Sequence, residues 1–152
     1  MAKYGKPRTA KGLATLCAKV AGDKLASDVQ VLDLTKIDSR PADFFVLCTC
    51  DSDVQVKAIY DEVLRTCTDL SINKPREEGI DNREWALLDF FDVVMHIMVR
   101  HAREYYKIEK LWGDAKFYSL SEEGELKSSR DQKIKEILDN NIANNGEAAE
   151  NE

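Results

Sequence analysis

The chain has 152 residues, of which 43% are hydrophobic, 33% charged and 8% aromatic, and its formal net charge is −6 at pH 7. This length is typical of one domain with a buried core. No apolar run approaches the roughly 18 residues that cross a bilayer, and residues 1–12 show no secretory signal. We therefore expect a globular protein of the cytoplasm, bacterial rather than organellar, that makes no membrane contact.

Charge is distributed unevenly along the chain. Residues 1–12 carry four basic side chains and no acid, whereas residues 121–152 carry four bases and nine acids. We expect 1–12 to be a basic flexible arm, 13–120 the folded domain and 121–152 an acidic tail, with a helix over 128–142 and a disordered end. The 13–120 segment is itself acidic. An RNA-binding module that uses the basic arm is an alternative function, but the negative charge of residues 13–120 disfavours it.

The first half of the chain shows helix and strand patterns in turn. Apolar residues at three- and four-residue steps predict a helix over 13–26. Alternation predicts a strand over 29–34, and the continuous apolar run 44–49 is typical of an interior strand. Ser52 is a good N-cap for a helix over 53–70.

The second half adds a hairpin and a third helix. We expect a short edge strand at 76–78, then strands at 84–90 and 92–100 that form a hairpin because so few residues separate them. Tyr105 and later apolar residues predict a helix over 102–112. The predicted fold class is α/β, with a mixed β-sheet flanked by helices.

Cysteine and histidine spacing does not favour a metal or a disulfide framework. No Cys-x-x-Cys occurs, and both histidines, His96 and His101, are distant from the cysteines in sequence. We expect reduced, buried thiols, a packed structural His96, a boundary residue at His101, and no metal or cofactor. The cysteines are Cys17, Cys48, Cys50 and Cys67.

Aromatic and acidic residues are concentrated between residues 85 and 114. Two Trp, two adjacent Tyr and two adjacent Phe exceed what a small core needs, and such residues beside acids are typical of protein interfaces. In a strand, Trp85, Leu87 and Asp89 would share one face, and Ala86 and Leu88 the other. For each single residue, a place in the core is the open alternative.

A catalytic alternative rests on the pair Asp51 and Asp53. With Asp89 or Asp92 as a third carboxylate, they would suit a metal-dependent nucleotidyltransferase-like enzyme. However, acids at this position also stabilise the start of the helix predicted over 53–70. No glycine-rich phosphate loop precedes them, so we predict that the protein is not an enzyme and has no catalytic residues.

Taken together, the motifs resemble those of the ribosomal silencing factor (Iojap) family. The resemblance runs from about residue 13 to residue 115 and keeps order and spacing. The motifs are Asp33-Leu34, Ala42-Asp43-Phe44-Phe45-Val46, Gln55-Val56 with Ala58-Ile59, Glu78-Gly79, Trp85-x-Leu87-Leu88-Asp89, Asp92-Val93-Val94-x-His96, and Arg103-Glu104-Tyr105-Tyr106 with Glu109, Leu111-Trp112 and Asp114-Ala115.

The resemblance implies a fold similar to nucleotidyltransferases and a role without catalysis. It implies binding to large-subunit ribosomal protein fourteen on the large ribosomal subunit, and repression of translation by steric exclusion of the small subunit. Separately, the basic arm is expected to make a minor contact to ribosomal RNA. From the exposed aromatic residues, we further expect a homodimer when the protein is free.

The predicted partner-binding site combines the positions that match the family's signature with the hairpin between them. The family commonly has Tyr-Gly where this chain has Phe90-Phe91, which removes a hydroxyl and adds a ring. The predicted contact residues are Trp85, Leu88, Asp89, Phe90, Phe91, Asp92, Tyr105, Tyr106, Trp112 and Asp114.

Overall fold

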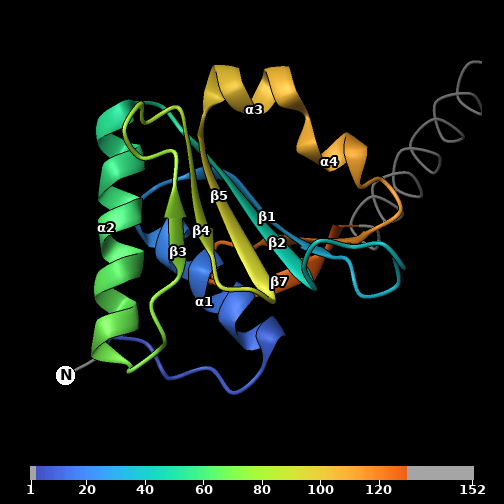
Figure 1. Cartoon of the computed structure of the whole chain (residues 1–152), viewed down its shortest axis with the longest axis horizontal. Helices are drawn as coiled ribbons and strands as arrows, with labels where there is room; N and C mark the ends of the chain where they lie inside the picture. Colours follow the sequence, from blue (N-terminus) through green and yellow to red (C-terminus); the bar gives the residue numbers. More distant parts are fainter. Residues whose placement is uncertain (1–2, 130–152) are drawn as a thin grey trace, which may run out of the picture.

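A computed structural model describes residues 3–129 as one α/β unit built on a seven-stranded sheet (Figure 1). The helix expected over 128–142 and the disordered end fall almost entirely outside the described residues. The elements are α1 Ala10–Asp23, β1 Ser27–Asp33, β2 Phe44–Cys50, α2 Asp53–Asp69, β3 Arg76–Glu78, β4 Trp85–Asp89, β5 Val93–Val99, α3 Arg100–Tyr106, α4 Ile108–Leu111, β6 Lys116–Leu120 and β7 Leu126–Ser128.

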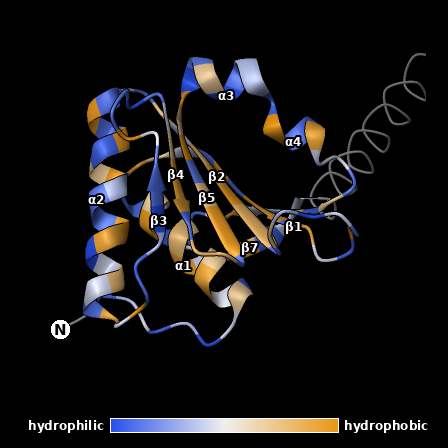
Figure 2. Ribbon diagram, viewed as in Figure 1, coloured by the Kyte–Doolittle hydropathy of each residue, from blue (hydrophilic) through white to orange (hydrophobic). Residues whose placement is uncertain are grey.

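The sheet is mixed, as predicted. Its strand order is β3-β4-β5-β2-β1-β6-β7, in which β2 and β5 run parallel and every other neighbouring pair runs antiparallel. All seven residues of β2 are buried, which confirms the interior strand expected from its continuous apolar run. Figure 2 shows hydrophobic residues along β2 and β5, and alternating character along α2, which is typical of an amphipathic helix.

Helices α1 and α2 pack on one side of the sheet, here called the α1–α2 face. Lys11 of α1 lies over the ring of Tyr118, with Nζ 4.7 Å from the ring centroid. Because paired residues in neighbouring strands point to the same side, the register extends this face from Tyr118 across the sheet. The row on this face is Tyr118, Val31, Val46, Met95 and Leu88.

Helices α3 and α4 lie over part of the other side, here called the α3–α4 face. The Arg103 side chain of α3 donates to Gln30 Oε1 at 2.8 Å and to Thr49 Oγ1 at 3.1 Å. Trp112, which follows α4, stands edge-on to Phe45, with ring centroids 6.0 Å apart. The row on this face is Ser119, Gln30, Leu47, His96 and Leu87.

Two helix starts follow from local capping. Ser52 accepts a hydrogen bond from the backbone N–H of Gln55 at 3.1 Å, which confirms the predicted N-cap of α2. Thr9 caps α1 in the same way by accepting from the N–H of Gly12 at 2.9 Å. α1 therefore begins three residues before the predicted start of 13–26.

The C-terminal part differs from the prediction in two ways. The helix expected over 102–112 is two short helices, because Lys107 adopts φ 48° and ends α3. β6 and β7 were not predicted, and β7 lies inside the segment assigned to the acidic tail, where it pairs with β6. Within residues 3–129, no helix has the length and apolar character needed to cross a membrane.

Candidate functional site

The β4–β5 hairpin presents one aromatic ring to solvent. The Phe90 N–H donates to the Val93 carbonyl at 2.8 Å, and Asp89 Oδ1 accepts from the Phe91 N–H at 2.8 Å. Phe91 adopts φ 79° and is 86% exposed. This left-handed conformation favours glycine and costs another residue on the order of 1 kcal/mol. A large apolar side chain at a strained, exposed turn suggests a contact residue.

Trp85 supports a group of aromatic rings at the other end of β4. Its indole Nε1–H donates to His96 Nδ1 at 3.1 Å. The ring centroids of Trp85 and Tyr106 are 4.7 Å apart, and Tyr105 stands edge-on to Tyr106 at 5.0 Å. Tyr105 is 79% exposed and Tyr106 50%. Two phenol rings are thus presented on a supported platform.

His96 is the buried support of that platform. Burial lowers the pKa of His96 to about 3, and the Arg103 guanidinium adds to the lowering. The imidazole is therefore neutral at pH 7, and its proton is on Nε2 because Nδ1 accepts from Trp85. The predicted packed structural histidine is confirmed. His101 is exposed in the first turn of α3, as expected of a boundary residue.

Arg103 is the important residue whose role was not predicted. It is 7% exposed, and besides Gln30 and Thr49 it donates to the carbonyl of Asp28 at 2.9 Å. Its Nε lies 3.5 Å from Glu109 Oε2, so one side chain joins α3 to the sheet and to the start of α4. Arg103 belongs to a motif that carries the family resemblance and Arg100 does not, but the motif did not indicate that Arg103 is buried.

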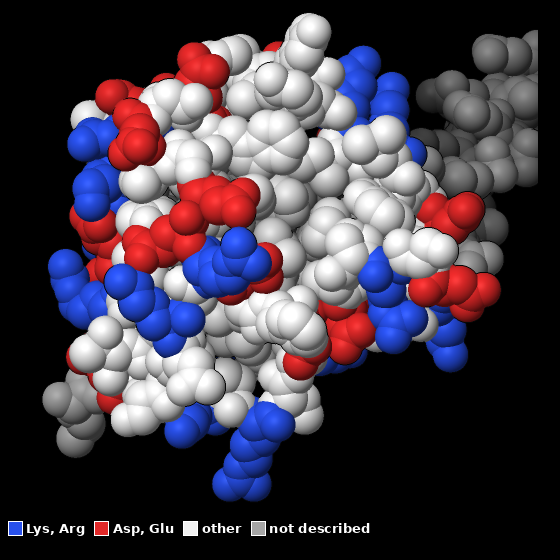
Figure 3. Space-filling view, viewed as in Figure 1, with Lys and Arg blue, Asp and Glu red and all other residues white. Residues whose placement is uncertain are grey.

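The turn at Lys107 directs the chain back over the sheet. It places Trp112 half-buried against Phe45, whereas Leu111 is exposed to solvent. Asp114 is also exposed. The α3–α4 segment therefore adds apolar and acidic side chains beside those of the hairpin. Figure 3 shows an uncharged area in the upper centre of this view, with acidic and basic side chains over the region of β3 and below α4.

Two of the predicted contact residues face the wrong way. Leu88 is fully buried on the α1–α2 face, so it is a core residue and cannot touch a partner. Phe90 is half-buried and lines a cavity with Ile72 and the segment before α1, on the side away from Trp85. Alternation along β4 explains Leu88, because every second side chain points away from α3 and α4, and Phe90 continues that alternation directly after the strand.

The structure separates the carboxylates of the catalytic alternative. Asp51 follows the end of β2, whereas Asp89 pairs with Val94 near the start of β5. Since β2 and β5 are parallel, the two acids lie at opposite ends of the sheet, more than about 15 Å apart. Asp51 instead pairs with Arg100, with Oδ1 2.8 Å from Nη2. The part of the chain that is described contains no group of three or more His, Cys, Asp or Glu residues placed to hold a metal.

The four cysteines are free and buried, as predicted. Burial raises the pKa of the Cys67 thiol to about 11 and also raises that of Cys17. These two thiols are therefore protonated and unreactive at neutral pH.

Comparison with known proteins agrees with these motifs. Residues 7–148 match the family model described as ribosomal silencing factor during starvation. The chain is 39% identical over 110 residues to ribosomal silencing factor RsfS of Bacillus subtilis (strain 168), covering 72% of this chain and 92% of that protein. It is 31% identical over 102 residues to the chloroplastic protein Iojap of Zea mays, covering 67% of this chain and 44% of that protein.

A solved structure shows the same fold. The crystal structure of a Chromobacterium violaceum protein superimposes with a TM-score of 0.65 at 32% sequence identity, covering 70% of this chain and 88% of that chain. The chain therefore belongs to the ribosomal silencing factor family.

Proposed function

We propose that this protein silences translation by binding the large ribosomal subunit through ribosomal protein fourteen and excluding the small subunit. Membership of the ribosomal silencing factor family supports a role at the ribosome. The observation that supports the contact surface is the set of exposed large hydrophobic side chains along α3, α4 and the β4–β5 turn. Six such side chains are exposed in residues 3–129. Tyr105, Tyr106 and Leu111 belong to α3 and α4, and Phe91 lies at the β4–β5 turn, at the other end of β4 from Trp85.

The form of this surface supports protein binding rather than catalysis. Trp85 and Trp112 are half-buried and held against the sheet, so they offer rigid aromatic area that loses little conformational freedom on binding. Trp and Tyr are the residues most often found at the centres of protein interfaces. About 800 Å² on each partner is enough for specific association, and exclusion of the small subunit then needs only bulk.

The contact residues proposed here are those of the predicted set that reach solvent near this surface. They do not include Leu88, which is in the core, or Phe90 and Asp92, which line the cavity beside Ile72 and the segment before α1. The remaining set is Trp85, Asp89, Phe91, Tyr105, Tyr106, Trp112 and Asp114.

Further expectations belong to the same proposal. The protein acts in the cytoplasm, is not an enzyme, and forms a homodimer when free through its exposed aromatic residues. The basic side chains within residues 1–12 make a minor contact to ribosomal RNA. The sheet topology is nucleotidyltransferase-like; the mixed strand order supports this without implying catalysis.

Cosedimentation with purified large subunits tests the contact surface. We expect Trp112→Ala and Asp89→Arg each to weaken binding roughly tenfold or more, as replacement of a central contact does. Val54→Ser is the control, because Val54 is an exposed apolar residue of α2 that is outside the proposed contact set. Normal binding by both folded variants would exclude this surface.

The competing activity, metal-dependent nucleotidyl transfer, has its own test. Magnesium-dependent nucleotide binding that is lost in Asp51→Ala would support it. The separation of Asp51 from Asp89 across the sheet argues against a shared metal site.

A further inference from the structure

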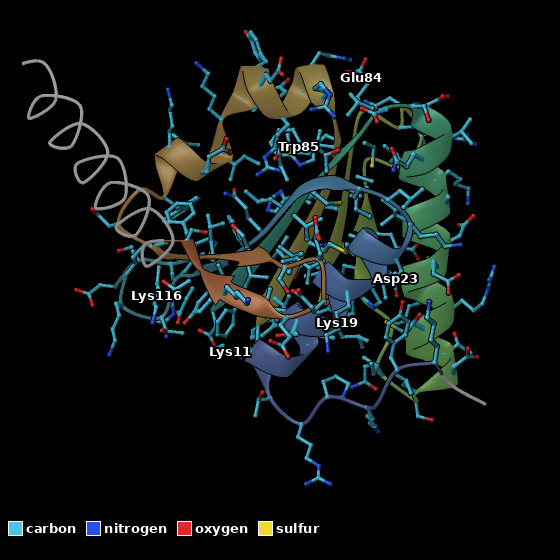
Figure 4. The ribbon with its side chains drawn as sticks, turned by 180° about the vertical axis from the view of Figure 1, so that it is seen from behind. Lys11, Lys19, Asp23, Glu84, Trp85 and Lys116 are labelled. Carbon is cyan, nitrogen blue, oxygen red and sulfur yellow. The ribbon has the colours of Figure 1, made fainter. Side chains whose placement is uncertain are left out.

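A small cavity opens beside Trp85, at the edge of the proposed contact surface. Its volume is about 310 Å³, which leaves room for one long side chain. Figure 4 shows Glu84 and Trp85 at this end of the sheet, beside α3. The residues that line it are Glu78, Gly79, Asn82, Glu84, Trp85, Leu87, Ala102 and Tyr106.

The cavity carries two carboxylates and no basic side chain. Among residues 3–129, Glu78 has no ion-pair partner, although its neighbour Glu77 pairs with Lys74 at 3.1 Å and with the Tyr60 hydroxyl. Glu84 Oε1 is 3.7 Å from the imidazole of His101. The cavity therefore has an uncompensated negative charge.

Two aromatic rings complete the wall. The Trp85 and Tyr106 rings meet at 47°, with their centroids 4.7 Å apart, and the bond to His96 fixes the indole. The face of an aromatic ring attracts a cation, and Trp is the best of the side chains in this respect. Leu87 supplies an apolar wall suited to an aliphatic stem.

The cavity is closed on one side by a backbone approach that needs glycine. Gly79 adopts φ 79°, and a Cβ there would lie 2.2 Å from the carbonyl oxygen of Trp85. This close packing holds the end of β3 and the loop after it against the backbone of Trp85, and Glu78 and Trp85 both line the cavity. The arrangement is therefore built into the fold.

We propose that this pocket binds one lysine or arginine side chain of the partner protein. The inference rests on the proposed function for the partner, because Tyr106 and Trp85 belong both to the pocket and to the proposed contact surface. Two carboxylates and two ring faces recognise an ammonium or guanidinium group, and the same carboxylates repel RNA phosphate. The basic side chain fixes the register of the partner on the surface.

Neutralising the carboxylates tests the pocket on the ribosome. We expect Glu78→Gln with Glu84→Gln to weaken large-subunit binding about tenfold and to reduce its dependence on salt concentration. The control is Glu122→Gln with Glu123→Gln, which changes the charge equally at the β6–β7 turn, at the opposite edge of the sheet, and should leave affinity within about twofold.

A second measurement needs no ribosome. Nα-acetyl-arginine amide, titrated into the ¹⁵N-labelled full chain, should shift the Trp85 indole N–H resonance saturably, whereas Nα-acetyl-glutamine amide should not. Comparison with Trp112→Phe assigns the two indole signals. The shift should disappear in the double variant at Glu78 and Glu84.

The outcomes separate the two proposals. If the wild-type protein binds subunits and the double variant binds equally well, the pocket proposal is overturned and the proposed function stands. If the wild-type protein does not bind subunits, the proposed function fails, and the titration decides the pocket alone: a saturable shift supports a cation site, and no shift overturns it.

Discussion

Replacing Arg103 by methionine should destabilise the fold more than the same replacement of Arg100, the other arginine of α3. The change keeps the length of the side chain but removes the donors to Asp28, Gln30 and Thr49. It also leaves the Glu109 carboxylate, 3.5 Å from Arg103 Nε, without its counter-charge.

The expected magnitude follows from the burial of the guanidinium. Removing one partner of a buried ion pair costs about 3–5 kcal/mol, because the other partner stays desolvated. Glu109 is only partly buried, with 32% of its side chain exposed, so the lower end applies and we expect a loss of about 3 kcal/mol. For a domain of this size that loss corresponds to a Tm lower by about 10 °C.

Urea and thermal unfolding measure this loss, with Arg100→Met as the matched control. Arg100 pairs with Asp51 on the surface, where ion pairs contribute little. We also expect the pKa of His96 to rise in Arg103→Met, since Arg103 helps to hold it down, while burial keeps it below its ordinary value. Unfolding free energies that are equal for Arg103→Met and Arg100→Met would refute the role given to Arg103.

Three further substitutions test other features of the fold. The pKa of His96 is about 3 in the folded state and about 6.5 when unfolded, so the unfolded chain binds an extra proton as pH falls. His96 should therefore remove about 2.5 kcal/mol of stability between pH 7 and pH 4.5, and urea unfolding of His96→Leu should show that much less acid sensitivity. Gly79→Ala should lower Tm more than Gly124→Ala, since both glycines have positive φ but only Gly79 approaches other atoms closely; equal effects would contradict the tight packing against Trp85. Phe91→Gly should raise the unfolding free energy by roughly 0.5–1 kcal/mol by relieving the turn, yet weaken large-subunit binding in cosedimentation; unchanged binding would remove Phe91 from the surface.

The sequence predicted the centre of the fold because those signals are local. The apolar run at 44–49 indicated an interior strand, and Ser52 marked the start of α2. The edge strand β3 was predicted at its observed bounds, Arg76–Glu78. Each of these depends on a few neighbouring residues, whose propensities the tertiary structure reinforces.

The features that were missed depend on contacts distant in sequence. Lys107 carries no glycine-like signal for its positive φ, so the break between α3 and α4 was not predicted. β6 is short and half-buried, and it becomes a strand by pairing with β1. Alternation in β4 separated Trp85 from Leu88 but did not reveal which face the helices would cover.

The sequence predicted which types of residue form the candidate site, but it did not predict how they are arranged. The clustering of Trp, Tyr, Phe and Asp indicated an interface, and the structure brings Trp85, Tyr105 and Tyr106 together. The support from His96 and Arg103 and the cavity at Glu78 arise from the sheet register and from the turn at Gly79. A single sequence does not contain this information.

A sucrose-gradient measurement with purified large and small ribosomal subunits tests the central claim most directly. We expect the protein to sediment with the large subunit and to reduce the fraction of joined particles. Protein that remains at the top of the gradient, while the subunits join as they do in its absence, would contradict the proposed function.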